Sequence, residues 1–202
     1  QLDGFDVYNL IVDGKVEFNN RVKPGAYDAV ATYLGDENFD ANSTAVSFIV
    51  KSPTTITASP VSVVYANTKN LVVTMKDYYG NAVANENVTV TLKGKTYVRT
   101  TDGKGQISVA LPSNLVPNTY TASIAFAGDD KYVQSSASVK VTVLKATPKI
   151  TAKAKTFKKS VKTKKYTITL KNNKNKVMKN TKVTIKVKGK TYTAKTNSKG
   201  QA

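Results

Sequence analysis

The sequence predicts an all-β chain made of tandem β-sandwiches, and three observations predict this class. Apolar and polar residues alternate over short runs, which is the pattern of strands with one buried face. Turns rich in Gly, Pro, Asn and Asp separate these runs about every ten residues. The same order of runs and turns returns after about 93–95 residues, so the 202 residues hold one complete repeat and two partial ones.

The repeat is clearest when residues 21–50 are compared with residues 115–143. Aromatic, glycine, acidic and valine positions of the first stretch return in the second at one constant spacing. A constant spacing is typical of an array of similar domains. The matched pairs, each about 93 residues apart, are Tyr27 with Tyr120, Gly35 with Gly128, Asp36 with Asp129, Phe39 with Tyr132, Val46 with Val139 and Val50 with Val143.

Residues 1–52 are predicted to be the C-terminal half of a repeat. A short strand is expected at residues 16–18, followed by strands over residues 27–34 and 45–50, whose side chains alternate. Pro53 then makes a short, stiff joint, because proline restricts the residue before it and has no N–H to donate to a ladder.

Residues 53–145 are predicted to be one complete repeat, a Greek-key β-sandwich. Pro60 divides the first edge strand in two, which an edge position tolerates. Short strands of this kind, separated by turns, are typical of a sandwich of ~90–100 residues. The predicted strands cover residue 56 and its neighbours, then residues 61–65, 71–75, 88–92, 96–100, 107–111, 120–126 and 139–143.

Residues 146–202 are predicted to be the N-terminal half of a third, lysine-rich repeat. Val183, Ile185 and Val187 alternate with lysine and threonine, so they form one apolar face that a half-sandwich cannot cover by itself. Two explanations stay open. Either the chain continues beyond Ala202, or another copy supplies the missing strands by strand addition.

Composition argues against most catalytic and metal chemistry. The chain contains no Cys and no His, which removes thiolate nucleophiles, thiolate metal sites, the usual general base near neutral pH and the commonest metal ligand. No apolar run approaches the ~18 residues of a membrane-spanning helix. We therefore expect no enzyme activity, no resident metal, no cofactor and no transmembrane segment within this sequence.

Basic charge is concentrated in one segment. The net charge is +18, and residues 146–202 contain 18 lysines and no acidic residue. Such a segment is expected to contact an anionic cell-wall polymer or lipid surface. Nucleic acid is disfavoured, because arginine is absent there and Phe157, Tyr166 and Tyr192 are spaced as strand residues, not as a stacking platform. The candidate contact residues are Lys158, Lys159, Lys162, Lys164 and Lys165.

Two smaller sets of residues are candidates for a metal site and for modification. Asp36, Glu37 and Asp40 lie in one loop and offer hard oxygens to calcium, although a solvated turn is the favoured interpretation. Asn42 and Asn87 begin acceptor sequences for N-glycosylation, which fits an extracellular chain.

Tyr27 and Tyr120 each stand at the start of a late strand, three residues after a proline. We interpret them as tyrosine corners, in which the phenol hydroxyl bonds to backbone at the sheet edge. A role as an aromatic platform for sugars is the disfavoured alternative.

Two related motifs, GKTYVRTTDGKGQ at residues 94–106 and GKTYTAKTNSKGQ at residues 189–201, occur with PNTYTASIAFAGDDKY at residues 117–132. With these motifs the chain resembles bacterial Ig-like repeats of large surface proteins, and it is most similar to repeats in adhesin-like proteins of methanogenic archaea. The resemblance spans nearly the whole chain and implies Ig-like sandwiches. Similar modules also decorate surface enzymes, so the motifs indicate the fold more than the function.

The resemblance implies a structural and adhesive function: a rigid multi-domain stalk on the extracellular cell surface, which mediates attachment or presents a distal binding region. The expected partners are a cell-wall polymer, a glycan or protein on a host or partner-cell surface, and neighbouring repeats of the same chain or of another copy. A module that binds polysaccharide or cell-wall polymer is the alternative. A third interpretation is a strand-complemented polymer subunit of a surface filament.

Overall fold

The computed structural model describes residues 22–202, and within that range it contains strands and no helix. The predicted all-β class is therefore confirmed for the described residues, while the Ig-like Greek-key assignment stays a prediction. The strand expected at residues 16–18 lies outside the described residues.

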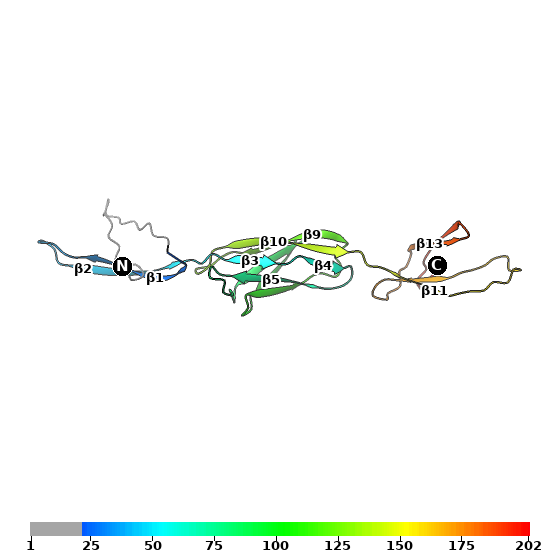
Figure 1. Ribbon diagram of the computed structural model, residues 1–202, viewed down its shortest axis with the longest axis horizontal. Coiled ribbons are helices and arrows are strands. Elements are labelled where there is room, and N and C mark those ends of the chain that lie inside the picture. Colours follow the sequence, from blue (N-terminus) through cyan, green and yellow to red (C-terminus); the bar gives the residue numbers. More distant parts are fainter. Residues whose placement is uncertain (1–21) are drawn as a thin grey trace. The chain divides into compact units, whose positions relative to one another are not determined.

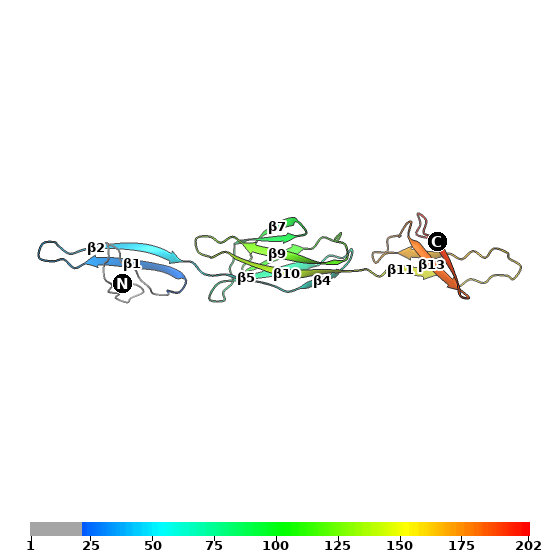
Figure 2. The same ribbon diagram turned by 90° about the horizontal axis from the view of Figure 1, so that it is seen from above.

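Residues 53–145 form two β-sheets. The strands are β3 (Thr55–Ala58), β4 (Val61–Val64), β5 (Asn70–Lys76), β6 (Asn87–Leu92), β7 (Lys95–Thr100), β8 (Gln106–Ala110), β9 (Asn118–Phe126) and β10 (Ser135–Leu144). One sheet has the order β3-β5-β8 and the other has the order β4-β10-β9-β6-β7. Figure 1 shows β9 and β10 in one layer and β3 and β5 in the other. Figure 2 shows β7, β9, β10 and β4 following one another across the larger sheet.

Alternation along each strand builds the core of this sandwich. Leu71, Val73 and Met75 of β5 are 0%, 1% and 0% exposed, while the residues between them are exposed or partly exposed. Val88 and Val90 of β6 are buried in the same way from the larger sheet. Because burial of one such side chain contributes about 1.5–3 kcal/mol, the alternation that predicts the strands also stabilises the two layers.

Pro60 separates β3 from β4, and the two strands belong to different sheets. β3 pairs antiparallel with β5, whereas β4 pairs in parallel with β10. In that parallel pair Val61 lies opposite Val141, and Val64 lies opposite Leu144. The predicted division at Pro60 is confirmed, and it places the N-terminal part of the sandwich beside its last strand.

The remaining described strands form three two-stranded sheets. They pair β1 (Gly25–Tyr33) with β2 (Asn42–Val50), β11 (Lys149–Ala152) with β12 (Ile168–Lys171), and β13 (Lys182–Val187) with β14 (Lys190–Lys195), all antiparallel. The strands predicted at residues 27–34 and 45–50 are confirmed in β1 and β2. Several apolar side chains of these sheets remain exposed, in contrast with the core of the middle sandwich.

The same turn occurs twice in atomic detail. Asp102 Oδ1 accepts hydrogen bonds from two backbone N–H groups of its turn, at 2.8 and 2.9 Å, and Asn197 Oδ1 does so at 2.9 and 3.0 Å. The residues just before them, Thr101 and Thr196, are buried, and each hydroxyl accepts a backbone N–H, at 2.9 and 3.0 Å. The recurring motif of the sequence is thus a recurring set of hydrogen bonds.

One expectation about the lysine-rich segment is wrong. Phe157 and Tyr166 lie between β11 and β12, and only Tyr192, in β14, is a strand residue. Strands form where a neighbouring strand offers hydrogen bonds, and no described strand pairs with residues 153–167. The spacing of aromatic residues alone could not reveal this.

Candidate functional site: an inter-repeat joint and a basic segment

The joint at Ser52-Pro53 is held to the middle sandwich by backbone hydrogen bonds. Ser52 N–H donates to the Lys131 carbonyl at 2.8 Å, and Val133 N–H donates to the Ser52 carbonyl at 2.9 Å. These bonds make a parallel bridge between Ser52 and Tyr132. The joint is therefore paired with a loop of the sandwich at its entrance.

Side chains add to these backbone bonds. The Ser52 side chain is buried, and its Oγ accepts the Tyr78 N–H at 3.1 Å. Thr54 Oγ1 donates to the Val133 carbonyl at 3.1 Å and lies 2.6 Å from Ser135 Oγ. Lys51 Nζ donates to the carbonyl of Asp129. A short segment with so many fixed partners has little freedom to bend, which agrees with the stiffness expected of an X-Pro joint.

Two carboxyl groups, those of Glu86 and Asp129, lie close to the joint. Burial is the main cause that raises the pKa of Glu86, and a hydrogen bond with Asp129 is the second. Burial opposes ionisation of Asp129 as well, but the N–H groups of Tyr132 and Lys131 outweigh it and hold the pKa of Asp129 below its usual value. Of the two carboxyl groups, Glu86 therefore keeps its proton to a higher pH than Asp129 does, because its pKa is raised while that of Asp129 is lowered.

An open depression of about 330 Å³ lies beside this pair. It is lined by Lys51, Ala127, Gly128, Asp129, Asp130, Tyr132 and Gln134. Its lining is mainly polar and it is open to solvent, in contrast with the enclosed, mostly apolar pockets that bind small molecules.

The loop with the calcium candidates repeats the bonds between carboxylate and backbone N–H groups that occur in the loop at the joint. Asp36 Oδ1 accepts the N–H groups of Asn38 and Phe39 at 2.8 and 2.9 Å, and its Oδ2 accepts the Tyr33 hydroxyl at 2.6 Å. The hydrogen bond from Tyr33, then that from Asn38, lowers the pKa of Asp36. Both oxygens of Asp36 thus fix the turn.

The structure does not bring a metal-binding set together in this loop. No group of three or more Asp, Glu, Cys or His side chains that could hold a metal ion occurs in residues 22–202. Calcium binding by Asp36, Glu37 and Asp40 stays a prediction.

Tyr27 makes the contact that the tyrosine-corner interpretation predicts. Its hydroxyl donates to the Lys23 carbonyl at 2.6 Å, and its ring stacks on Phe48 with centroids 5.7 Å apart. The corresponding ring of Tyr120 lies 5.9 Å from Lys93 Nζ. Tyr27 therefore serves the structure of the hairpin.

Both glycosylation candidates are exposed at the first residue of a strand. Asn42 begins β2, and its Oδ1 accepts the Ser43 N–H at 2.8 Å. Asn87 begins β6, and its Oδ1 accepts the Thr100 hydroxyl at 2.9 Å. These positions are accessible to modification, which stays a prediction.

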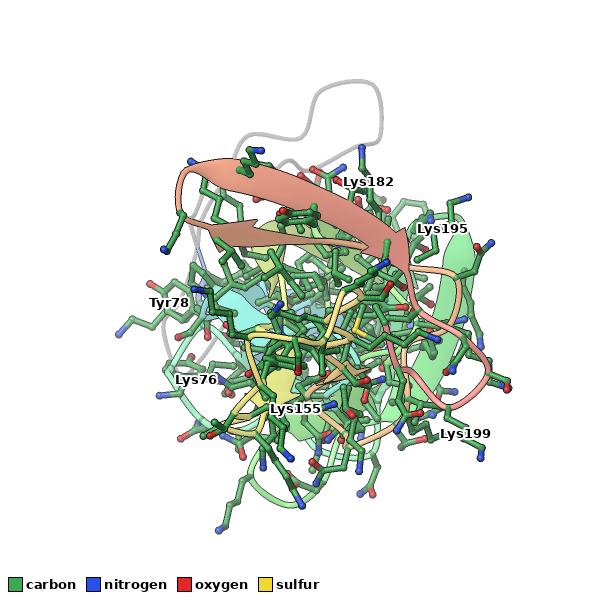
Figure 3. All side chains as sticks on the ribbon, turned by 90° about the vertical axis from the view of Figure 1, so that its right-hand side faces the viewer. Lys76, Tyr78, Lys155, Lys182, Lys195 and Lys199 are labelled. Atoms are coloured by element: carbon green, nitrogen blue, oxygen red, sulfur yellow. The ribbon has the colours of Figure 1, made fainter. Side chains whose placement is uncertain are left out.

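The basic candidates gather in the stretch between β11 and β12. Lys158, Lys159, Lys162, Lys164 and Lys165 are all exposed there. Lysine side chains inside the stretch tie it together, since Lys155 Nζ donates to the Lys165 carbonyl at 2.9 Å and Lys164 Nζ donates to the Val161 carbonyl at 2.7 Å. Figure 3 shows other lysines of the segment, such as Lys182 and Lys199, with their amino groups directed outward. Contact with an anionic surface stays a prediction.

Sequence reasoning missed the contribution of Ser52 and of the buried threonines Thr101 and Thr196. The sequence marks Ser52 only as the residue before a proline, and nothing local indicates its partner Tyr132. The threonines had a usable signal, because Thr101 and Thr196 both precede the Asp or Asn of the repeated turn.

Within the described residues, no helix is long and apolar enough to cross a membrane.

No family model matches the chain, and no curated protein matches it. Among similar solved structures is one from work on host cell surface retention of a 1.5-MDa bacterial ice-binding adhesin, with 16% identity over 87% of this chain and 61% of that chain, and a TM-score of 0.38. A tetra-tandem repeat from the extending region of a large adhesion protein has 18% identity over 90% of this chain and 48% of that chain, with a TM-score of 0.38.

An S-layer protein has 16% identity over 87% of this chain and 25% of that chain, with a TM-score of 0.39. This chain spans less than two thirds of each of these structures. At such identities and TM-scores, the likenesses carry no argument about function.

Proposed function

We propose that the chain is a structural, adhesive protein of the extracellular cell surface, in which tandem sandwiches form a stiff stalk. We also propose that residues 1–52, 53–145 and 146–202 are separate repeats. We further propose that these repeats are similar to those of adhesin-like proteins of methanogenic archaea. The observation that carries it is the hydrogen-bonded joint, in which Ser52 pairs with Tyr132. A flexible linker between independent binding domains has no need of such bonds.

The residue inventory supports a mechanical role over a catalytic one. The chain has no His and no Cys, and its polar groups at the joint bond to one another and to backbone. No nucleophile–base–orienter arrangement is built from these groups. The proposed role is therefore that of a non-enzymatic spacer.

The joint can be tested by measuring whether the β1–β2 hairpin and the middle sandwich tumble together. We expect NMR relaxation to give both one correlation time in the wild-type chain. In the variant Ser52→Gly/Thr54→Gly, the hairpin should have a shorter correlation time than the sandwich, because the side-chain hydrogen bonds are lost and the backbone gains freedom. Separate correlation times in the wild type would contradict the stalk.

A second candidate function is the binding of an anionic polysaccharide or cell-wall polymer by the lysine-rich segment. The observation that favours it is the exposure of all five candidate lysines between β11 and β12. Retention of the full chain on wall fractions, and its release by salt, would support this function. A pure spacer would show no retention.

A further inference from the structure

One face of the β13–β14 hairpin carries lysines where the complete repeat carries neutral residues. Lys182 lies opposite Lys195 in this hairpin. The same place in the complete repeat, about 95 residues earlier, holds Asn87 opposite Thr100. There the Thr100 hydroxyl donates to Asn87 Oδ1 at 2.9 Å, so a neutral hydrogen bond joins the two strands. Two lysines cannot make such a bond with each other, because an ammonium group only donates.

A third lysine stands on the same face of the hairpin. Lys186 lies opposite Thr191, whereas the complete repeat has Thr91 opposite Thr96, with their hydroxyl oxygens 3.4 Å apart. Residues two or four apart in a strand lie on one face, so Lys186 shares the face of Lys182. We call this surface the basic face; its members, all exposed, are Lys182, Thr184, Lys186, Thr191, Thr193 and Lys195.

The basic face is opposite to the apolar face of the hairpin. Val183 and Ile185 alternate with the lysines of β13 and are partly buried. Their counterparts in the complete repeat, Val88 and Val90, are 0% and 1% exposed and belong to the core. The basic face therefore corresponds to the solvent-facing side of the sandwich.

Lys182 and Lys195 repel each other across the hairpin. Directly opposite residues of an antiparallel pair have Cβ atoms about 4.5–5.5 Å apart, and like charges at this distance destabilise the pair. Residues 146–202 contain 18 lysines and no acidic residue, so this repeat has no carboxylate side chain to place between the two ammonium groups. An anion from outside the repeat would relieve the repulsion.

Opposed lysines also occur in the other small sheet of this repeat. Lys149 of β11 lies opposite Lys171 of β12, where the complete repeat has Thr55 opposite Lys76. Lysine in place of a neutral cross-strand partner is thus a repeated property of residues 146–202 and is not confined to one hairpin.

Phosphate fits the basic face better than carboxylate does. An ammonium group binds phosphate as a point charge, and the hydroxyls of Thr184 and Thr193 add donors beside it. A planar carboxylate is best held by the fork of an arginine, and residues 146–202 contain no arginine. Lys182 and Lys186 are four residues apart, about 13 Å along the strand, so a ligand that meets both must carry more than one phosphate group.

We propose that the basic face of β13–β14 binds a polymer with successive phosphate groups, one of them between Lys182 and Lys195 and another at Lys186. The ligand neutralises the lysine pair, so binding also stabilises the repeat. This inference rests on the second candidate function, the binding of an anionic polymer, and adds to it a site in the strands and the chemical class of the ligand.

The test compares the full chain with the variant Lys182→Asn/Lys186→Thr/Lys195→Thr, which carries the residues of the complete repeat at these positions. The probe is long-chain inorganic polyphosphate, and calorimetric titration measures its affinity. We expect the affinity to fall at least about tenfold and its dependence on salt to become shallower, because fewer phosphates are neutralised. Equal affinities of the variant and the wild type would overturn the proposal.

Thermal melting separates lost binding from lost structure. Without polyphosphate the variant should melt no lower than the wild type, because the repulsion between Lys182 and Lys195 is removed. With polyphosphate the melting temperature of the wild type should rise more than that of the variant. Equal rises would overturn the proposal. The single variant Lys195→Thr should change the affinity in the same direction with less change to the strands.

The matched control is Lys174→Gln/Lys179→Gln/Lys199→Gln. It removes the same charge from exposed lysines that lie outside β13 and β14 in the same repeat. Its affinity should stay within about threefold of the wild type, because charges away from the contact act only through screened attraction. Equal losses in the control and in the basic-face variant would overturn the site, since binding would then follow total charge.

Other anions test the chemical class. Poly-glutamate should bind more weakly than polyphosphate of equal charge, and orthophosphate at the same phosphate concentration should compete poorly. Equal affinity for poly-glutamate would overturn the preference for phosphate, and full competition by orthophosphate would overturn the polymer. Retention on vesicles of anionic phospholipid without binding of polyphosphate would assign the face to lipid headgroups instead.

Failure of this site can be told from failure of the second candidate function. A wild-type chain that binds neither polymer nor wall fractions would contradict both. Binding that is lost only when Lys158, Lys159, Lys162, Lys164 and Lys165 are replaced would overturn the basic face and leave that function in place.

Discussion

The hydroxyl oxygens of Thr54 and Ser135 lie 2.6 Å apart and share a hydrogen bond, although 81 residues separate them in the sequence. This bond joins the segment that enters the middle sandwich to the first residue of its last strand. Together with the bridge between Ser52 and Tyr132, it makes the joint part of the sandwich and not merely a connection to it.

Removal of the Ser52 hydroxyl should destabilise the sandwich. Ser52→Ala leaves the Tyr78 N–H without its acceptor in a partly buried place, so we expect the free energy of unfolding to fall by about 1–2 kcal/mol. Urea denaturation measures the change. Ser62→Ala, at an exposed position of β4, is the control and should stay within about 0.5 kcal/mol of wild type. Equal effects of both changes would show that the Ser52 bond adds no stability.

Gly105 should be far less replaceable than Gly94, although both have positive φ angles, of 68° and 74°. A Cβ at Gly105 would collide with the Met75 carbonyl and lie 3.0 Å from the Val83 nitrogen, while a Cβ at Gly94 meets nothing within 4 Å. We expect Gly105→Ala to cost about 2–4 kcal/mol and Gly94→Ala about 1–2 kcal/mol, measured by thermal or urea unfolding. Similar costs would mean that the turn can shift to make room.

Stability should respond to pH through Glu86. Its pKa is raised in the folded state, so its contribution is fully present below its unfolded pKa and is lost as pH rises through the folded value. Glu86→Gln, which stays neutral, should therefore be more stable than wild type at neutral pH. Glu86 is only partly buried and solvent screens its charge, so the gain should be no more than about 0.5 kcal/mol.

This gain should shrink as pH falls below about 4, where Glu86 is protonated in both states. Melting temperatures of both proteins between about pH 3 and 7 test the trend. Glu37→Gln, in the exposed loop of the first repeat, supplies the comparison. A gain that persists unchanged at acid pH would not come from the ionisation of Glu86.

The lysines between β11 and β12 should carry binding to anionic surfaces. Replacing Lys158, Lys159, Lys162, Lys164 and Lys165 by Gln should weaken retention on vesicles of anionic lipid by at least about tenfold at low salt, since each lysine near such a surface contributes about 1 kcal/mol. Co-sedimentation measures this retention.

A control with the same change in net charge distinguishes a local site from overall charge. It replaces the middle-repeat lysines Lys69, Lys76, Lys93, Lys104 and Lys140 by Gln. We expect it to retain most of the binding. Equal losses of binding in both variants would show that binding depends on the total charge, and would contradict a local lysine site.

Much of the middle fold could be predicted because its signals are local. The alternation of Leu71, Val73 and Met75 states which face is buried, and Pro60 marks where the first strand divides. In contrast, Phe157 and Tyr166 have strand-like spacing, but no strand within residues 22–202 pairs with the stretch that holds them. The spacing of residues indicates which face of a strand each side chain would lie on. It does not indicate whether a second strand is present to pair with it.

The candidate site was less predictable for the same reason. Asp36 offers carboxylate oxygens in the sequence, but in the structure its Oδ1 accepts the N–H groups of Asn38 and Phe39 and its Oδ2 accepts the Tyr33 hydroxyl. Short-range bonds of this kind follow from Asx-turn chemistry and could be anticipated. The partners of Ser52 could not be anticipated, because Tyr78 and Tyr132 are distant in the sequence and lie beside Ser52 only in the folded sandwich.

The parallel pairing of β4 with β10 determines how the sandwich would respond to tension. A pull applied at the joint before Pro53 and after Leu144 acts on strands that run the same way, with Val61 beside Val141 and Val64 beside Leu144. The hydrogen bonds between these strands would be loaded in shear and at the same time, instead of breaking one after another from one end. For a module in a chain under load, this geometry places resistance to shear at the last strand, through which the force leaves.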